Sequence, residues 1–402
     1  MRRQPAVGFV LACVFLDALG IGLIIPVLPR LVGTLAESPD AQTAWYGAIM
    51  VSYGLMQFFS APVIGALSDR IGRRPVLLAG ICGLAIMMFV PAFTNSLWAI
   101  LASRLAGGMM SSNMVVAQAY IADVTPAERR TSAFGRIGAI FGIAFILGPA
   151  LGGLLGEESP RIPFLFAGII CTANFLYGLL ILPESLPPNA RSAAPISLSR
   201  INPLAMLASL SREKAILPIL LIVTLYTLSQ SIVQCTWALY TEFRYGWTPR
   251  LIGFSIFALG FAITATQGAA LPWLAKRLSA ERLTLAGLTV GFASLVGIGF
   301  STNGTAAALL ICTFALMGVV GPTLQSVVSR TGDPKSQGIR LGAMSSLNSF
   351  TGAISPVVGT PLLLSTIGSD PSSFSAGIPY LLSSLLIVAA AVIALLRPIP
   401  EK

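Results

Sequence analysis

The 402-residue sequence contains no histidine, and charged residues make up only 10% of it. Without histidine, the chain lacks the most frequent general acid–base residue and a common metal ligand. Its five cysteines lie singly in apolar stretches and form no CxxC pair, so neither a disulfide framework nor a His/Cys metal site is expected. We therefore expect no bound metal and no cofactor.

Signatures of enzymes are missing as well. The sequence has neither a Walker A nor a GxSxG pattern, and Asp17 is its single carboxylate within a long apolar run. A non-transporting sensor would need a sizeable soluble output domain, and the longest loop is only a linker. These absences disfavour a membrane enzyme and a sensor, and we expect no catalytic residues.

Apolar residues, in contrast, are abundant. Hydrophobic residues make up 55% of the chain, and the mean hydropathy of +0.83 is far above that of a soluble domain. The apolar runs are about 20 residues long, which suits membrane-crossing helices and is too long for barrel strands. We predict an all-α integral membrane protein with twelve transmembrane helices, at about 7–29, 44–68, 75–94, 98–122, 132–156, 162–183, 214–240, 250–274, 282–302, 305–328, 340–366 and 375–396.

The first apolar segment resembles a signal peptide, because Arg2 and Arg3 precede it and Ala18–Gly20 matches a cleavage site. The apolar stretch continues to Pro29, however. That length is sufficient for a span, and we expect the segment to remain as the first transmembrane helix.

Lysine and arginine are distributed unevenly between the two sets of loops. One set holds only Arg30, Arg161, Arg244 and Arg250, whereas nearly all the others lie in the opposite loops and the termini. By the positive-inside rule, both termini are expected to be cytoplasmic. The net charge of +10 therefore reflects the cytoplasmic face of a bilayer protein and not a nucleic-acid partner.

The spans fall into two groups of six. We predict an N-terminal six-helix bundle over 1–183, a proline- and serine-rich cytoplasmic linker over 184–213, and a C-terminal six-helix bundle over 214–402. The segment Gly65–Gly80 aligns with Pro272–Gly287 at an offset of 272 − 65 = 207 residues. Two pseudo-symmetric parallel bundles with a site near the midplane are the architecture of alternating-access transporters.

Asp17 is the residue for which a functional role is most strongly indicated. An ionised carboxylate is expensive to hold in hydrocarbon, so an acid within a span is a candidate for ion or substrate handling. Gly20, Gly22, Pro26 and Pro29 follow it, and we expect this part of the helix to be kinked and closely packed.

The loop after the second span carries a dense charged motif. It includes Gly65, Asp69, Arg70, Arg73 and Arg74. This pattern resembles the signature loop of the major facilitator superfamily. We expect Asp69 to lie at the start of a neighbouring helix, where the dipole favours an anion, and Arg73 and Arg74 to pair with nearby acids. The cluster is predicted to gate the transporter; the alternative is that the arginines only anchor the cytoplasmic face.

A second charged group follows the fourth span. Asp123 and the segment from Glu128 to Arg130 lie on the same membrane side as that loop. They could complete its charge network. An ordinary solvated loop is equally compatible with the sequence, because exposed ion pairs contribute little to stability.

The fifth span is rich in glycine. Its pattern resembles the antiporter motif of exporters in the superfamily and comprises Gly142, Gly148, Pro149, Gly152, Gly153 and Gly156. Small residues also allow close helix packing whatever is transported. The export direction is therefore implied by the resemblance.

Polar side chains within the other spans are candidates for lining a large, mostly apolar substrate cavity. They are Gln57, Asn113, Gln230, Gln234, Trp237, Gln267, Gln325 and Asn348. For any single one of them, and for Gln118 and Asn174, a hydrogen bond between helices is an alternative role.

Across nearly its whole length the chain resembles the tetracycline efflux branch of the drug:proton antiporters. The resemblance is carried by Leu16–Pro29, Ser68–Leu78, Phe141–Pro160 and Thr241–Trp247. It implies the twelve-helix major facilitator fold, a bacterial cytoplasmic (inner) membrane location, function as a monomer, and export of a tetracycline–metal chelate in exchange for a proton.

The same resemblance identifies Arg104, in the sequence RLAGG, as the arginine of the fourth span. Its implied role is to help control protonation of Asp17, because a nearby cation favours the ionised carboxylate. A snorkelling arginine near the outer interface is the alternative. The acids and histidine that the family carries in spans three, eight and nine fall at about Met87, Ile263 and Gly291, which leaves Asp17 as the one buried carboxylate.

We therefore predict a secondary active exporter of small amphipathic compounds or drugs, tetracycline-like by resemblance. Its partners are a small-molecule substrate, protons and the lipid bilayer. Asp17 and Arg104 are the predicted proton-coupling residues. The alternative is a facilitator or metabolite exporter without proton coupling.

Overall fold

In a computed structural model of the chain, the described residues are 7–111, 113–126, 130–191, 217–330, 337–364, 373–397 and 399. All the regular secondary structure in these ranges is helical, as predicted. The chain forms two compact units. Unit 1 comprises Met1–Ser38, Ala48–Asn202 and Thr248–Phe257, and unit 2 comprises Pro39–Gly47, Pro203–Trp247 and Ala258–Lys402. Most of the predicted linker, together with Glu128 and Arg129, lies outside the described residues.

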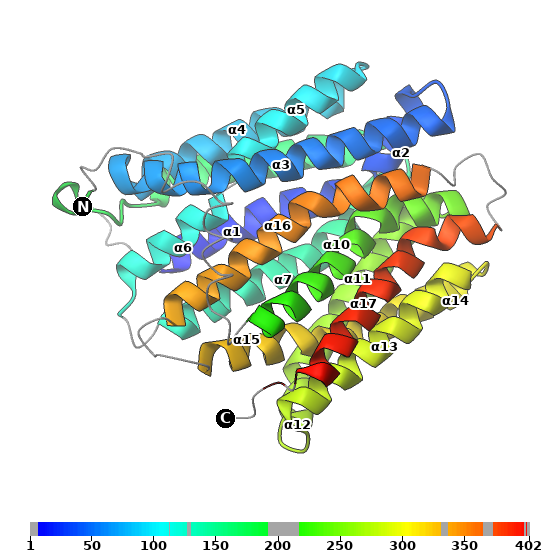
Figure 1. The fold of residues 1–402 in the computed structure, drawn as a ribbon. Coiled ribbons are helices and arrows are strands. Elements are labelled where there is room, and N and C mark those ends of the chain that lie inside the picture. Colours follow the sequence, from blue (N-terminus) through cyan, green and yellow to red (C-terminus); the bar gives the residue numbers. More distant parts are fainter. Residues whose placement is uncertain are drawn as a thin grey trace. The chain divides into compact units, whose positions relative to one another are not determined.

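The helices of unit 1 come mainly from the first half of the sequence (Figure 1). They are α1 (Val7–Ile24), α2 (Leu28–Leu35), α3 (Pro39–Ile71), α4 (Arg73–Phe93), α5 (Leu97–Met110), α6 (Asn113–Val124), α7 (Arg130–Leu155), α8 (Ile162–Ile181) and the short η2 (Pro188–Ala190). The first residues of α3 belong to unit 2.

Unit 2 contains longer and more interrupted helices. They are α10 (Leu217–Tyr245), α11 (Pro249–Ala265), the π-helical η3 (Thr266–Ala270), α12 (Leu271–Leu274), α13 (Ala280–Phe300), α14 (Gly304–Phe314), the 3₁₀ segment η4 (Ala315–Val319), α15 (Val320–Arg330), α16 (Gln337–Leu364), η6 (Phe374–Gly377) and α17 (Ile378–Leu396). The first residues of α11 belong to unit 1. In Figure 1, α13 and α14 run side by side.

The predicted spans have counterparts in the structure. Among the described residues, ten helical segments are long and apolar enough to cross a membrane, and Phe350–Leu363 within α16 is a shorter apolar helix. The span predicted at about 98–122 is divided between α5 and α6. Together these segments account for all twelve predicted spans.

The first predicted span is broken where its prolines lie. Helix α1 ends at Ile24, and α2 begins at Leu28 with Pro29 in its first turn. Between them, the N–H of Val27 donates to the carbonyl oxygen of Ile24 at 3.2 Å, a tighter turn than that of an α-helix. Proline cannot donate a backbone hydrogen bond, which explains the interruption. The kink expected after Asp17 is therefore confirmed, in the form of a break.

Close backbone contacts join α1 to α7. A Cβ atom on Gly22 would lie 3.0 Å from the Cα atom of Gly148, and one on Gly152 would overlap the carbonyl group of Leu23. Residues without side chains allow such close approach, and the dispersion contacts then hold the two helices together. The tight packing expected after Asp17 is present at this contact.

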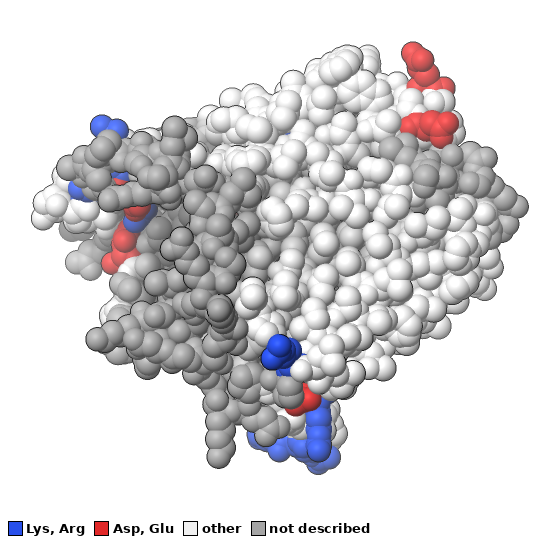
Figure 2. All heavy atoms as spheres, in the orientation of Figure 1, with Lys and Arg blue, Asp and Glu red and all other residues white. Residues whose placement is uncertain are grey.

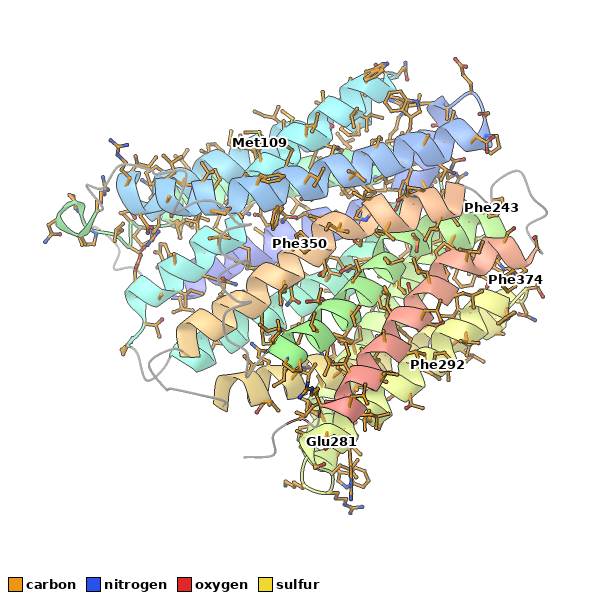
Figure 3. All side chains as sticks on the ribbon, in the orientation of Figure 1. Met109, Phe243, Glu281, Phe292, Phe350 and Phe374 are labelled. Atoms are coloured by element: carbon orange, nitrogen blue, oxygen red, sulfur yellow. The ribbon has the colours of Figure 1, made fainter. Side chains whose placement is uncertain are left out.

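The outer faces of the helices carry exposed apolar side chains. Met109, Phe292 and Phe374 are three of them (Figure 3). On the face seen in Figure 2, the charged side chains of the described residues gather at the margins and leave a wide uncharged area between them. Such a surface suits contact with lipid chains and not with water.

We expect Gly152→Ala to destabilise the protein by ~1–3 kcal/mol, since the added methyl group overlaps the Leu23 backbone. Thermal unfolding in detergent should show a midpoint lower by roughly 5 °C. Gly142→Ala is the matched control in the same helix, because nothing lies within 4 Å of a Cβ atom on Gly142. Equal midpoints for the two variants would contradict this account of the α1–α7 contact.

Candidate functional site

The carboxylate of Asp17 is held between three helices of unit 1. Asp17 lies on α1 and is half-buried. Asn113, the first residue of α6, donates from Nδ2 to Asp17 Oδ2 at 2.8 Å. Asn174 of α8 donates from Nδ2 to Asp17 Oδ1 at 3.2 Å, and also to the carbonyl oxygen of Cys13 at 3.0 Å. Two neutral amides thus stabilise the carboxylate without neutralising its charge.

This arrangement changes the interpretation of two asparagines. Asn113 was expected in the substrate cavity, but it is buried and its amide group faces Asp17. Asn174, for which a hydrogen bond between helices was the expected role, is fully buried and donates to both the backbone and the acid of α1. A polar amide in the middle of an apolar span is a sequence signal for such a contact, but it does not identify the partner.

Arg104 lies in α5, and its side chain is buried, with 5% of its surface exposed. Its guanidinium carbon is 5.5 Å from the ring centre of Phe164 and 6.0 Å from that of Tyr53. The Nε and Nη2 atoms have no hydrogen-bond partner. Within the part of the chain that the structure describes, no ion pair joins Arg104 to Asp17. Any influence of Arg104 on Asp17 is therefore not exerted through a direct ion pair in this structure, and the burial disfavours a snorkelling arginine.

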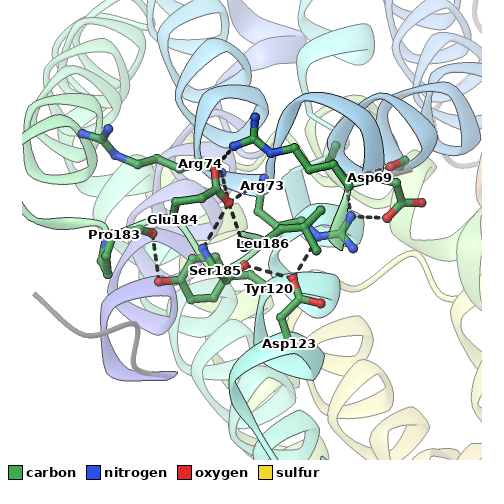
Figure 4. Close-up of polar contacts among 12 residues, drawn as sticks. Asp69, Arg73, Arg74, Tyr120, Asp123, Pro183, Glu184, Ser185 and Leu186 are labelled. Carbon is green, nitrogen blue, oxygen red and sulfur yellow. Dashed lines mark hydrogen bonds and ion pairs between the residues drawn. The ribbon is translucent and has the colours of Figure 1, made fainter. Parts of the chain in front are cut away.

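A second polar cluster surrounds Arg73 at the junction of α3 and α4 (Figure 4). Arg73 is buried, and its guanidinium group lies 2.6 Å from Asp69 Oδ1 and 3.1 Å from Asp123 Oδ2. Its Nη1 atom also donates to Ser68 Oγ at 2.6 Å. One arginine therefore links the last turn of α3 to the last turn of α6, and Arg73 and Asp123 come together as the sequence suggested.

The helix start in this cluster is occupied by an acid that the sequence analysis did not single out. Glu184 Oε1 accepts hydrogen bonds from the backbone N–H groups of Arg73 at 2.9 Å and Leu186 at 3.1 Å. The first of these is an orphan donor at the N-terminus of α4, where the helix dipole favours an anion. Asp69 was expected at such a position, but it lies in the last turn of α3 and pairs with Arg73 instead. A glycine with φ of 109°, Gly72, allows the sharp turn between the two helices.

The other residues of the predicted gating motif have different surroundings. No ion pair between described residues includes the guanidinium group of Arg74; its Nη2 atom donates to the carbonyl oxygen of Leu179 at 2.7 Å. Arg70 is exposed. A Cβ atom on Gly65 would be in van der Waals contact with Val115 of α6, so this glycine permits α3 and α6 to pack together.

The predicted antiporter-motif glycines fall into two groups. Gly148 and Gly152 pack against the backbone of α1, with Pro149 between them inside α7. Gly153 packs against Gly253, in the first residues of α11, which belong to unit 1. Gly142 has open space around it. Close packing therefore applies to the second half of the motif and not to its first residue.

Among the predicted cavity residues, Gln57, Gln234, Gln267, Gln325 and Asn348 are exposed, and Gln230 is half-buried. A polar side chain exposed along an apolar span favours a water-filled cavity over lipid.

Trp237 differs from them, because 3% of its surface is exposed. Its ring packs edge-on against Trp247 and Tyr380. The prediction that Trp237 lines the cavity is therefore wrong for this structure. The ring is enclosed in an aromatic core, which its size and flat faces suit.

Gln267 lies in the π-helical segment η3 and contacts the 3₁₀ segment η4. Its Nε2 atom donates to the carbonyl oxygen of Gly318 at 3.2 Å. Non-α backbone at membrane depth is tolerated where it is buried in protein or lines a water-filled cavity. Close by, the side chain of Met317 fills the space that a side chain at Gly291 would occupy. The position of the absent span-nine acid is thus packed with an apolar side chain.

We expect Glu184→Ala to lower the stability of the protein by ~1–3 kcal/mol, because the α4 donors lose a charged acceptor. The thermal unfolding midpoint in detergent should fall by roughly 5 °C. Glu157→Ala is the control: its pair with Arg250 at 3.6 Å is 44% exposed on the Glu157 side, so its loss should cost under about 0.5 kcal/mol. A smaller effect at Glu184 than at Glu157 would contradict the capping role.

Comparison with known proteins shows the family. Residues 10–356 match the Major Facilitator Superfamily. The class C tetracycline resistance protein of Escherichia coli is 34% identical over 365 residues, covering 90% of each chain. The class D protein of Salmonella ordonez is 33% identical, covering 99% of this chain and 98% of that protein.

A solved structure of the human organic anion transporter MFSD10 (TETRAN) has a TM-score of 0.70 and 25% identity, covering 97% of this chain and 100% of that one. The fold predicted from the twelve apolar runs is that of these proteins. The chain belongs to the Major Facilitator Superfamily and is a multi-pass membrane transporter of small molecules.

Proposed function

We propose that this transporter exports small amphipathic compounds, including tetracycline-like drugs, in exchange for protons. It would act as a monomer in a bacterial inner membrane with both termini in the cytoplasm. Its two six-helix halves, 1–183 and 214–402, would alternate access to a site near the midplane. The similarity to tetracycline resistance proteins over 90% or more of the chain supports the substrate class.

The observation that carries the proposal is the environment of Asp17. Both carboxylate oxygens accept hydrogen bonds from amide groups on other helices, Asn113 on α6 and Asn174 on α8. The ionised form suits this arrangement best, because a protonated oxygen becomes a donor and a weaker acceptor. When a proton binds, the amide contact at that oxygen weakens or turns, and the attachment of α1 to α6 or α8 changes. Proton binding is thereby coupled to helix packing.

The other predicted site residues have supporting roles in this proposal. Arg104 is buried in the same unit as Asp17 and adds positive charge to the interior that Asp17 occupies. The cluster of Asp69, Arg73, Asp123 and Glu184 would tie α3, α4 and α6 together in one gating state and release them in the other. The exposed amides of Gln57 and Gln267 would offer hydrogen bonds to a bulky, mostly apolar substrate.

A facilitator or metabolite exporter without proton coupling is the second candidate. It is favoured by the apolar packing around Met317 and Gly291, which leaves no titratable group at that place in unit 2. Such a transporter would move its substrate down a concentration gradient, and the rate would not respond to an imposed pH difference.

Asp17→Asn should abolish proton-driven transport, because an amide cannot gain or lose the proton. In inverted vesicles with an acidic interior, uptake of tetracycline or a fluorescent drug should fall at least tenfold relative to the wild type. Exchange of the same compound without a pH gradient should persist, since the variant can still alternate.

Asp40→Asn is the matched control, because Asp40 is exposed at the start of α3. It should keep wild-type uptake. Full pH-driven uptake by Asp17→Asn would refute the coupling role, and wild-type uptake that ignores the gradient would favour the facilitator.

A further inference from the structure

Arg104 is a buried cation that has no counter-charge within the described ranges. Its side chain is 5% exposed, and none of the ion pairs found among the described residues includes it. Its neighbours are the faces of Phe164 and Tyr53, which attract a cation through the ring quadrupole but accept no hydrogen bond in its plane. A charge held in this way is unfavourable unless a partner of opposite sign reaches it.

The unpaired atoms of Arg104 form one edge of its guanidinium group. Nε and Nη2 carry parallel N–H bonds, and both lack a partner. This fork is the geometry that binds the two oxygens of a carboxylate or sulfonate.

A third donor lies on the neighbouring ring. The hydroxyl group of Tyr53 is buried and has no hydrogen-bond partner in the described structure. The nearby hydroxyl of Ser111 donates to the carbonyl oxygen of Gly108 at 2.9 Å. Arg104 and Tyr53 thus both present donors without a hydrogen-bond partner among the described residues, which is the arrangement expected of an anion site.

None of the ion pairs found in the described part of the chain brings an acid to this place. Both oxygens of Asp17 face Asn113 and Asn174. On the α4 side, the residue that contacts α5 one turn beyond Arg104 is Met87, whose Cβ would be 3.7 Å from a Cβ atom on Gly107. A thioether gives no charge compensation.

We propose that Arg104 binds the anionic group of the transported compound, with Tyr53 donating a further hydrogen bond. The substrates are then amphipathic organic anions, carboxylates or sulfonates. This rests on the proposed function, since it assigns the substrate class of that transporter. It also gives Arg104 a role that differs from control of Asp17, because the arginine touches the substrate.

The test uses two probes of the same shape, 1-naphthylacetate and 1-naphthylacetamide, in equilibrium binding to the purified protein. The carboxylate should bind the wild type at least tenfold more tightly than the amide. Arg104→Gln should weaken binding of the carboxylate at least tenfold and leave that of the amide unchanged. Tyr53→Phe should weaken only the carboxylate, by a smaller factor of twofold to fivefold.

Met87→Glu is a second variant that keeps the arginine. It supplies an internal carboxylate near Arg104, which should compete with the probe and reduce its affinity at least tenfold, with no effect on the amide. Size-exclusion chromatography would reveal whether Arg104→Gln folds. If it does not fold, the Met87→Glu variant still tests the anion site.

Equal affinities of the wild type for the two probes, absence of carboxylate binding, or equal weakening of both probes in these variants would overturn the anion site. Failure of the proposed function has a different signature. A wild type that binds the carboxylate selectively but shows no pH-dependent transport retains the anion site and loses proton coupling. Asp40→Asn, at an exposed position, should bind the carboxylate as the wild type does.

Discussion

The structure of unit 1 depends on an ionisable group that is stabilised by neutral partners. Asp17 accepts hydrogen bonds from asparagines on two other helices, and Asn174 also donates to the backbone of α1. Because the amides carry no charge, they hold the carboxylate without fixing its protonation state as strongly as an ion pair would. The helices α1, α6 and α8 therefore meet at a point where the gain of one proton changes the set of available hydrogen bonds.

Glycine contacts determine how far such a change can spread. Helix α1 is joined to α7 by the backbone approach of Gly22 to Gly148 and of Leu23 to Gly152. Contacts between backbones cannot be adjusted by a change of rotamer, so α1 and α7 must move together or separate as a whole. The break between α1 and α2 lies just beyond these contacts, at Ile24–Leu28. Helix α1 can therefore move by a change of backbone dihedral angles at this break, without an equal movement of α2.

Features set by local chemistry could be predicted from the sequence. Apolar runs gave the spans, and prolines gave the break after Ile24, because both follow from the solvation and geometry of the residues themselves. Which polar groups meet across the fold was harder. Glu184 and Arg73 are 111 residues apart, and Asp17 and Asn174 are 157 residues apart. The sequence around each residue does not show which distant residue it contacts. Trp237 shows the same limit: its composition suits a cavity wall or an aromatic core, and only the position of Tyr380 decides between them.

The π-helical segment Thr266–Ala270 has a geometric consequence for the helix that follows it. A π turn contains one residue more than an α turn, so every later side chain is rotated by about 100° relative to a continuous α-helix. Through this offset, η3 sets the direction in which α12 presents Trp273, whose ring lies 4.1 Å from the guanidinium carbon of Arg277. Deletion of a single residue from this segment would rotate the side chains of α12 about the helix axis by about 100°.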